Sequence, residues 1–321
     1  MPNANVKPAT KSVVDYIAEN ADALAGVCDS LFWFGEPAMQ EVRSAELLSG
    51  ILEDGGFSVE RGISGFPTGF MATYGSGEPV IAIHTEYDAA PNNSQKPGVA
   101  EHSAIIDGGP GHCEGHNVNG AVMIASAMAV RRAMEEHGLK GTLKVFGAPA
   151  EELVLARPYY VRDGYFDDVD VAFHPHLWDR FFTEYGVLQR AAVSAEFIFH
   201  GETAHAAMSP WDARDALDGV MLMDSGLAQY REHIRPGMSM HRVITDGGDQ
   251  PNVIPSRAAI WWFFRDTTAE GAQELFEHGK KVAEGAALMT NTELEVVIKT
   301  AVWPVRGNQA LAEALQRNIE L

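Results

Sequence analysis

The sequence is poor in cysteine and in basic residues, and it has no long apolar run. Cys28 and Cys113 are the only cysteines in 321 residues, too few for a disulfide framework. Lys and Arg number 24 against 44 Asp and Glu, and the net charge of −20 argues against nucleic acid or an anionic membrane as a partner. The polar first residues and the short apolar runs predict neither a signal peptide nor a transmembrane helix. We therefore expect a cytoplasmic protein.

What the sequence does contain is the composition of a globular protein with enough residues for two domains. Hydrophobic residues make up 46% and charged residues 21%. In the first half, strand-like and helix-like patterns alternate, which predicts an α/β layer with a mostly parallel sheet. Helices are expected over residues 10–30, from Pro37 to Gly55 and from Asn117 onward, and strands over 57–60, 69–74, 80–84, 142–147 and 169–173.

The pattern changes near residue 188. The elements expected there are a strand over 191–200, a helix over 213–233, strands over 238–245 and 258–264, a helix over 268–288 and a strand over 293–300. This βαββαβ order predicts an inserted α+β (ferredoxin-like) lid or dimerisation domain over residues 189–300. Residues 1–188 and 301–321 would form the catalytic domain. A helix beginning near Asn308 is followed by no further strand, so we expect part of that domain to lie outside this sequence.

Acidic and imidazole side chains follow the predicted strands of the first domain. They are Glu86 and Asp88 after strand 80–84, Glu151 and Glu152 after strand 142–147, and His174 and His176 after strand 169–173. Because the carboxyl ends of neighbouring parallel strands converge, these side chains are expected to lie together. Converging acids and imidazoles are typical of a transition-metal hydrolase.

The segment GHCEGHN ends a loop over residues 85–115 that is rich in Pro, Gly and Asn. Loops of that length in a compact domain are usually functional. Glu114 and His116 could aim at one point only through an irregular turn, which Gly115 permits. A lone histidine would favour a structural role, but His112, Cys113, Glu114 and His116 within five residues favour a metal site.

The ordered motifs EYDAAP, GHCEGHN, PAEE, HPH, GETAHA and NVIPSRA resemble the aminoacylase/carboxypeptidase family of metal-dependent amidohydrolases, and within it the aminobenzoyl-glutamate hydrolase branch. Members cleave amide C–N bonds with one or two divalent metals. The resemblance implies that His116 and Glu152 are metal ligands, that Asp88 supports the metal site and that Glu151 is the general base. Glu86 stands where many members have a metal-binding histidine.

The resemblance also implies one metal ligand from the HPH motif, for which both His174 and His176 are candidates. His205 matches a lid histidine that reaches the partner's active site in family dimers. Asn252, in the NVIPSRA motif, is expected to contact substrate. Arg265 ends an apolar strand, where it can either pair with Asp266 or bind a substrate carboxylate through two hydrogen bonds.

Two departures from the family pattern affect these expectations. Glu114 stands where this branch has cysteine, and a carboxylate in that position would favour Mn²⁺ or Zn²⁺ with oxygen-rich ligation. A one-residue shift in register would instead let Cys113 bind the metal. The second departure is that the family's last histidine ligand belongs to a C-terminal segment that this sequence lacks.

Together these observations predict a metal-dependent hydrolase of a C–N bond in an aromatic or amino-acid amide. One alternative is hydrolytic deamination of an aromatic amine such as 5-nitroanthranilate, which the altered Glu114 position suggests. A second is a non-catalytic binding or dimerisation protein, which would fit the missing C-terminal ligand. The expected partners are a small-molecule substrate and further copies of the chain, in a homodimer or higher homo-oligomer.

Overall fold

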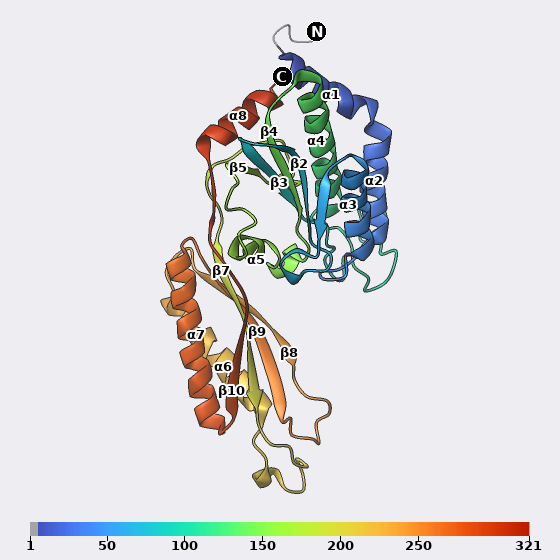
Figure 1. Ribbon diagram of the computed structural model, residues 1–321. Helices are drawn as coiled ribbons and strands as arrows, with labels where there is room; N and C mark the ends of the chain where they lie inside the picture. The colour runs from blue at the N-terminus through green and yellow to red at the C-terminus, as the bar shows by residue number, and fades with distance from the viewer. Residues whose placement is uncertain (1–5, 321) are drawn as a thin grey trace. The chain divides into compact units, whose positions relative to one another are not determined.

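The computed structural model describes residues 6–320 and divides into two compact units, one ending at Phe181 and the other spanning Phe182–Glu320 (Figure 1). Each unit has its own hydrophobic core. Among the helices of residues 6–320, none has the length and apolar composition required to span a bilayer.

A five-stranded sheet organises the first unit. Its strands are β1 (Ser58–Arg61), β2 (Phe70–Ser76), β3 (Val80–Thr85), β4 (Gly141–Gly147) and β5 (Val171–Phe173), in the order β1-β2-β4-β3-β5. Neighbours are antiparallel over β1-β2-β4 and parallel over β4-β3-β5. The predicted α/β class is thus confirmed with a mixed sheet, whose parallel part carries all three strands that precede the predicted site residues.

Helices cover both faces of this sheet. Helices α1 (Pro8–Glu19), α2 (Ala21–Phe34), α3 (Val42–Asp54) and α4 (His116–His137) lie on one side (Figure 1). Buried side chains of α2, α3 and α4, among them Leu31, Leu48 and Met123, pack there against Ala72 and Val145 of the sheet. On the other face, α5 (Arg157–Arg162) contributes Tyr160 to a smaller core with Phe66 and Phe146.

Two predicted helices have different bounds in the structure. The helix expected over residues 10–30 is two helices that meet at Asn20, whose side-chain amide donates to the carbonyl of Tyr16. The helix expected from Pro37 begins only at Val42. The Glu36 carboxylate accepts hydrogen bonds from the backbone N–H groups of Arg43 and Ser44, which satisfies the free donors of the first turn.

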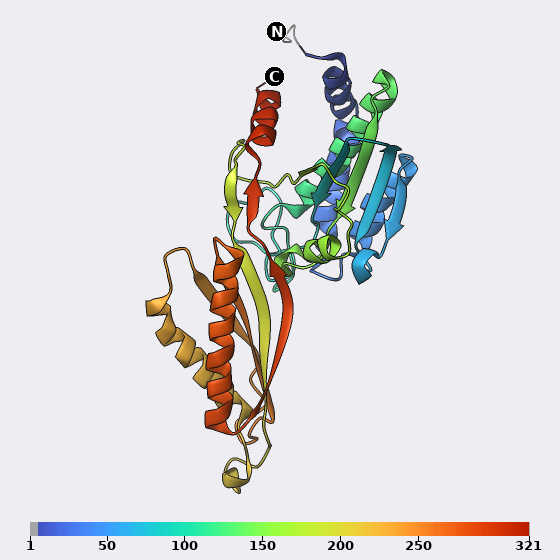
Figure 2. The same ribbon diagram turned by 60° about the vertical axis from the view of Figure 1, so that its left-hand side comes forward.

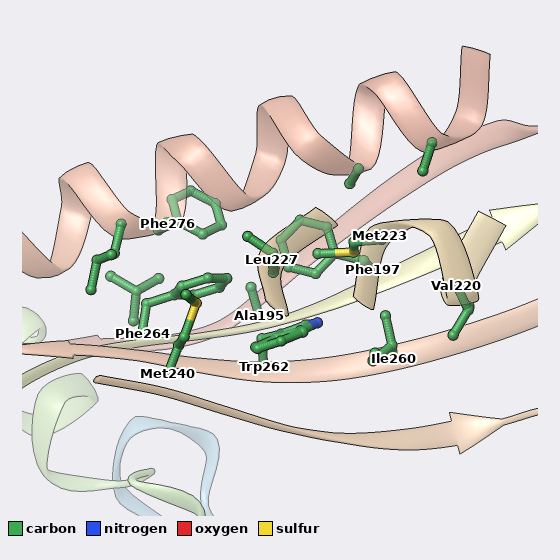
Figure 3. Packing of buried hydrophobic residues seen from close by; sticks show 14 of the residues in the cluster. Ala195, Phe197, Val220, Met223, Leu227, Met240, Ile260, Trp262, Phe264 and Phe276 are labelled. Atoms are coloured by element: carbon green, nitrogen blue, oxygen red, sulfur yellow. The ribbon is translucent and has the colours of Figure 1, made fainter. Parts of the chain in front are cut away.

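The second unit contains the predicted split βαβ arrangement. Its elements are β7 (Ala191–His200), α6 (Ala216–Tyr230), β8 (Ser239–Asp246), β9 (Arg257–Asp266), α7 (Ala269–Thr290) and β10 (Glu293–Val302). The strands are antiparallel in the order β10-β7-β9-β8, and Figure 2 shows α6 and α7 on one face of the sheet. Between these layers, Phe197, Trp262 and Phe264 pack against Leu227 of α6 and Phe276 of α7 (Figure 3).

The second unit also includes a separate two-stranded sheet. Strand β6 (Gly186–Gln189) pairs antiparallel with β11 (Val305–Gly307), and α8 (Gln309–Ile319) follows. The predicted assignment of residues 301–321 to the catalytic domain stays a prediction, with Leu321 outside the described residues.

Candidate metal centre

The carboxyl ends of β3, β4 and β5 bring the predicted site residues of the first unit together. Glu86 and Asp88 follow β3, Glu151 and Glu152 begin the 3-10 helix η2 (Glu151–Leu153) after β4, and His174 and His176 follow β5. His116 is the first residue of α4, one residue earlier than the predicted start at Asn117. Gly115, with φ 79°, forms the turn before it, while the Asn117 side chain donates to Cys28 instead of capping the helix.

His116 lies at the centre of the cluster and is 1% exposed. Its Nδ1 lies 2.9 Å from the backbone carbonyl oxygen of Asp88 and 3.2 Å from Oδ1 of the same residue. A carbonyl can only accept, so Nδ1 carries the proton and Nε2 presents its lone pair to the cluster. Burial lowers the pKa of His116, but the Asp88 carboxylate, the charge of Glu151 and the hydrogen bond to the Asp88 carbonyl together outweigh this effect, and the pKa is raised overall.

Glu151 and Glu152 approach this histidine from the end of β4. One carboxylate oxygen of Glu151 lies 3.9 Å from Nε2 of His116, and the backbone N–H of Glu152 donates to Oδ2 of Asp88 at 3.1 Å. Burial raises the pKa of Glu151 to about 7, with Asp88 and the other nearby carboxylates adding to the shift and His116 opposing it. Burial and the charge of Glu114 likewise raise the pKa of Glu152.

Two groups of side chains have the spacing of a metal site in the described part of the chain. One group is Glu114, His116 and Glu152, and the other is Glu86, His116 and His176. Within each group the potential ligand atoms lie within 4.8 Å of one another. Cys113 is exposed and belongs to neither group. Of these two neighbouring residues, Glu114 is the one that lies with His116 and Glu152, and whether it binds a metal stays a prediction.

Glu86 is fully buried, and one charged and two uncharged side chains contact its carboxylate. Its carboxylate is ion-paired with the guanidinium of Arg157. It accepts a hydrogen bond from the Asn119 amide at 2.7 Å and lies 2.9 Å from Nε2 of His174. His176, in contrast, keeps its Nε2 4.0 Å from Glu86 while Nδ1 donates to the carbonyl of Leu177. Nε2 of His174 therefore lies within hydrogen-bonding distance of Glu86, whereas Nε2 of His176 lies beyond it.

The side chains of the two groups are chemically suited to bind a divalent cation. Nε2 of His116 and Oδ1 of Asp88 are buried atoms with no hydrogen-bond partner in the described residues, although such atoms are normally paired. Imidazole and carboxylate donors in this combination suit Zn²⁺ and Mn²⁺. The hydrogen bond from Nδ1 to a backbone carbonyl is the arrangement that orients a histidine ligand in metal sites.

The three remaining predicted site residues belong to the second unit. The segments of His205 and Asn252 pair with each other: the N–H of Ala206 donates to the carbonyl of Asn252 at 3.0 Å. Arg265 lies at the far end of β9, where its guanidinium stacks over the ring of Phe263. His205 and Asn252 thus lie in two paired segments outside the four-stranded sheet, one after β7 and one before β9, whereas Arg265 lies near the C-terminal end of β9.

Sequence reasoning did not find Asn119 and Arg157, which hold Glu86. Asn119 lies three residues after His116, on the same face of α4, so helical spacing could have indicated it. Arg157 begins the short helix α5, and no motif marks it. Its contact with Glu86 depends on how the segment after β4 folds back over the sheet.

Comparison with known proteins finds relatives among hydrolases and peptidases. Residues 187–288 match the family model for the M20 peptidase dimerisation domain. The chain is 36% identical over 304 residues to one of the subunits of p-aminobenzoyl-glutamate hydrolase from Escherichia coli K12, and the match covers 94% of this chain and 63% of that protein. The resemblance to the M20 hydrolase family is confirmed. The chain thus spans less than two thirds of the length of this curated relative.

Solved structures show the same fold. The crystal structure of the aminobenzoyl-glutamate utilization protein from Klebsiella pneumoniae superposes with a TM-score of 0.74 at 20% identity, over 95% of this chain and 82% of that one. A dinuclear metal-binding peptidase of the M20 family from Bacillus subtilis superposes with a TM-score of 0.60 at 23% identity, over 92% and 78% of the two chains. At these identities the likeness concerns the fold.

Proposed function

We propose that the protein is a metal-dependent hydrolase that cleaves the C–N bond of an aromatic or amino-acid amide. The observation that carries the proposal is the unpartnered Nε2 of His116, which has Glu114 and Glu152 around it and the Glu151 carboxylate at 3.9 Å. The similarity to a p-aminobenzoyl-glutamate hydrolase supports an amide with an aromatic group as the substrate class.

In this proposal, His116, Glu114 and Glu152 hold the metal, with His176 and Glu86 adjacent to them. A bound Mn²⁺ or Zn²⁺ would acidify water and polarise a carbonyl group. Glu151 accepts the proton of the attacking water and delivers it to the leaving nitrogen. Asp88 fixes the orientation of His116 through Nδ1, and it also holds the backbone of Glu152.

The second unit would supply dimer contacts and substrate-binding groups. Its match to a peptidase dimerisation domain supports a homodimer or higher homo-oligomer. The Escherichia coli relative is one of two differently named subunits, so association with a different chain is the alternative. His205 and Asn252 would reach substrate, and Arg265 would bind a substrate carboxylate through two hydrogen bonds.

Hydrolytic deamination of an aromatic amine is the second candidate, and the presence of Glu114 in the cluster favours it. Here water would replace the amino group at an electron-poor ring carbon, and ammonia would leave. The two reactions differ in their products, because the first releases an aromatic carboxylic acid or amine together with an amino acid, and the second releases ammonia.

The test is product analysis on a panel of aryl amides and nitroaryl amines with Mn²⁺ or Zn²⁺ added. We expect an amino-acid product that depends on added metal and disappears in Glu151→Gln. Ammonia as the sole nitrogen product would replace the first candidate by the second. Metal binding without turnover of either substrate class would favour a non-catalytic protein.

A further inference from the structure

Glu41 is a fully buried carboxylate outside the metal centre, and no sequence motif points to it. It lies directly before α3 and is 0% exposed. Oε1 accepts hydrogen bonds from the backbone N–H groups of Met39 at 3.0 Å and Ala150 at 2.8 Å, and Oε2 accepts one from the Thr68 hydroxyl at 3.0 Å. The three donors are uncharged. Burial raises the pKa of Glu41, so placing a carboxylate here has a cost that needs an explanation.

The contact with Ala150 places Glu41 next to the catalytic turn. Ala150 is the residue before Glu151 and has φ 57°, in the left-handed region that non-glycine residues rarely adopt. Val154 and Ala156 in the same segment also have positive φ, at 57° and 54°. Such backbone persists only where surrounding contacts over-determine it, and it concentrates at functional sites.

Two buried carboxylates hold this turn, one on each side of Glu151. Glu41 accepts from the N–H of Ala150, and Asp88 accepts from the N–H of Glu152 at 3.1 Å. The Tyr87 hydroxyl, between Glu86 and Asp88 in sequence, donates to the carbonyl of Thr68, whose side chain in turn contacts Glu41. The carboxylate of Glu151 therefore projects from a backbone that is fixed at both of its neighbours.

We infer that Glu41 is a positioning residue that holds the Ala150–Glu152 turn so that the Glu151 carboxylate stays opposite Nε2 of His116. The inference rests on the proposed hydrolase function, since it assigns to Glu41 the placement of the general base. Within the described residues the Glu41 carboxylate accepts hydrogen bonds from Met39, Thr68 and Ala150, so it would act on Glu151 through the backbone of Ala150. A misplacement of about 1 Å in a reacting group can cost about 100-fold in rate.

Two substitutions at this position separate placement from charge. Glu41→Ala removes all three hydrogen bonds. Glu41→Gln keeps the two bonds from Met39 and Ala150, which its amide oxygen can accept. It replaces the third bond by one that the amide nitrogen donates to the Thr68 hydroxyl. If placement matters, the glutamine variant should restore function without the negative charge.

Glu36 offers a matched control at the start of the same helix. Its carboxylate also accepts three hydrogen bonds, from the N–H groups of Arg43 and Ser44 and from the Ser44 hydroxyl, and none of them reaches the turn at Ala150. Glu36→Ala therefore removes a comparable number of hydrogen bonds from α3. It leaves intact the hydrogen bonds that Glu41 and Asp88 accept from Ala150 and Glu152.

The experiment measures kcat, KM, bound metal and amide hydrogen exchange over residues 148–155 in the three variants at a temperature where each is folded. We expect Glu41→Ala to lower kcat by about 100-fold with little change in KM or metal content, and to speed exchange in this segment. Glu41→Gln should retain most of the wild-type kcat, and its exchange in this segment should stay as slow as in the wild type. The same is expected of Glu36→Ala.

Equal effects of Glu41→Ala and Glu36→Ala on kcat would overturn the inference, because they would indicate a general loss of stability. A glutamine variant as impaired as the alanine variant would also overturn it, in favour of a role for the charge. Failure of the proposed function would appear differently, as no turnover by the wild-type protein. In that case hydrogen exchange alone tests whether Glu41 holds the Ala150–Glu152 turn. Unchanged exchange in Glu41→Ala would contradict the inference.

Discussion

Nδ1 of His116, the first residue of α4, lies 2.9 Å from the backbone carbonyl oxygen of Asp88, three residues after the end of β3. This hydrogen bond determines which ring nitrogen carries the proton, and so Nε2 is the atom that faces Glu114, Glu151 and Glu152.

Glu151→Gln should keep the fold and the metal but lose turnover. The amide has the shape of the carboxylate but cannot accept a proton, and loss of a general base typically costs about 10²–10⁴-fold in rate. Steady-state kinetics with metal analysis on the same sample provide the measurement. A variant with near-wild-type kcat would remove Glu151 from this role.

His116→Ala should lower metal content together with activity, because it removes the one side chain shared by both candidate ligand groups. His102→Ala is a matched control, since His102 is an exposed histidine in the loop that precedes His116. Metal per chain is measured after dialysis. Full occupancy in His116→Ala would make His116 a structural residue.

Glu114→Cys should still bind metal but shift its preference from Mn²⁺ toward Zn²⁺, since thiolate is the softer donor. Cys113→Ser should leave metal binding nearly unchanged, because Cys113 is exposed and outside both groups. Competition titrations with the two metals measure the preference. If Cys113→Ser strips the metal and Glu114→Ala does not, the ligand register is shifted by one residue, and the aromatic-amine candidate loses its support.

Glu41→Gln should become more stable relative to the wild type as pH rises. Burial raises the pKa of Glu41 above its ordinary value of 4.5 in the folded state. The protonated acid is therefore favoured by folding, and this contribution is present below pH 4.5 and is lost as pH rises through the folded-state pKa. Denaturant unfolding of both proteins at pH 5 and pH 8 gives the comparison. A stability difference that stays constant, or shrinks toward pH 8, would contradict it.

The second unit should mediate a dimer. The strand order leaves β8 and β10 at the edges of the sheet, and Val243 and Ile244 of β8 are 54% and 44% exposed. Light scattering at micromolar concentration should give twice the mass of the chain. We expect Ile244→Lys to weaken the dimer if it forms through β8, whereas a monomeric wild type would rule out the prediction.

The sequence was most informative where local pattern and fold agree. The βαββαβ order of the second unit follows from hydrophobic periodicity, because each of its elements buries one face against the same core. The pairing of acids with strand ends predicted the cluster of the first unit, since the carboxyl ends of β3, β4 and β5 lie at one edge of the sheet. The helix boundaries at Asn20 and Val42 were not predicted because hydrophobic periodicity does not mark them. They coincide with side-chain hydrogen bonds, from Asn20 to the carbonyl of Tyr16 and from the N–H of Arg43 to the Glu36 carboxylate.

By itself, the sequence determined the fold class, the family resemblance and the identities of the acidic and imidazole groups that could hold a metal. Only the tertiary structure showed which of those groups lie together: Glu114 with His116 and Glu152, His174 beside Glu86, and Glu41 and Asp88 on either side of Glu151. The physical reason is that residue type and spacing fix what a side chain can donate or accept. Its actual partner depends on the backbone of distant segments, such as Glu41 and Ala150, that come together only when the sheet and its helices pack.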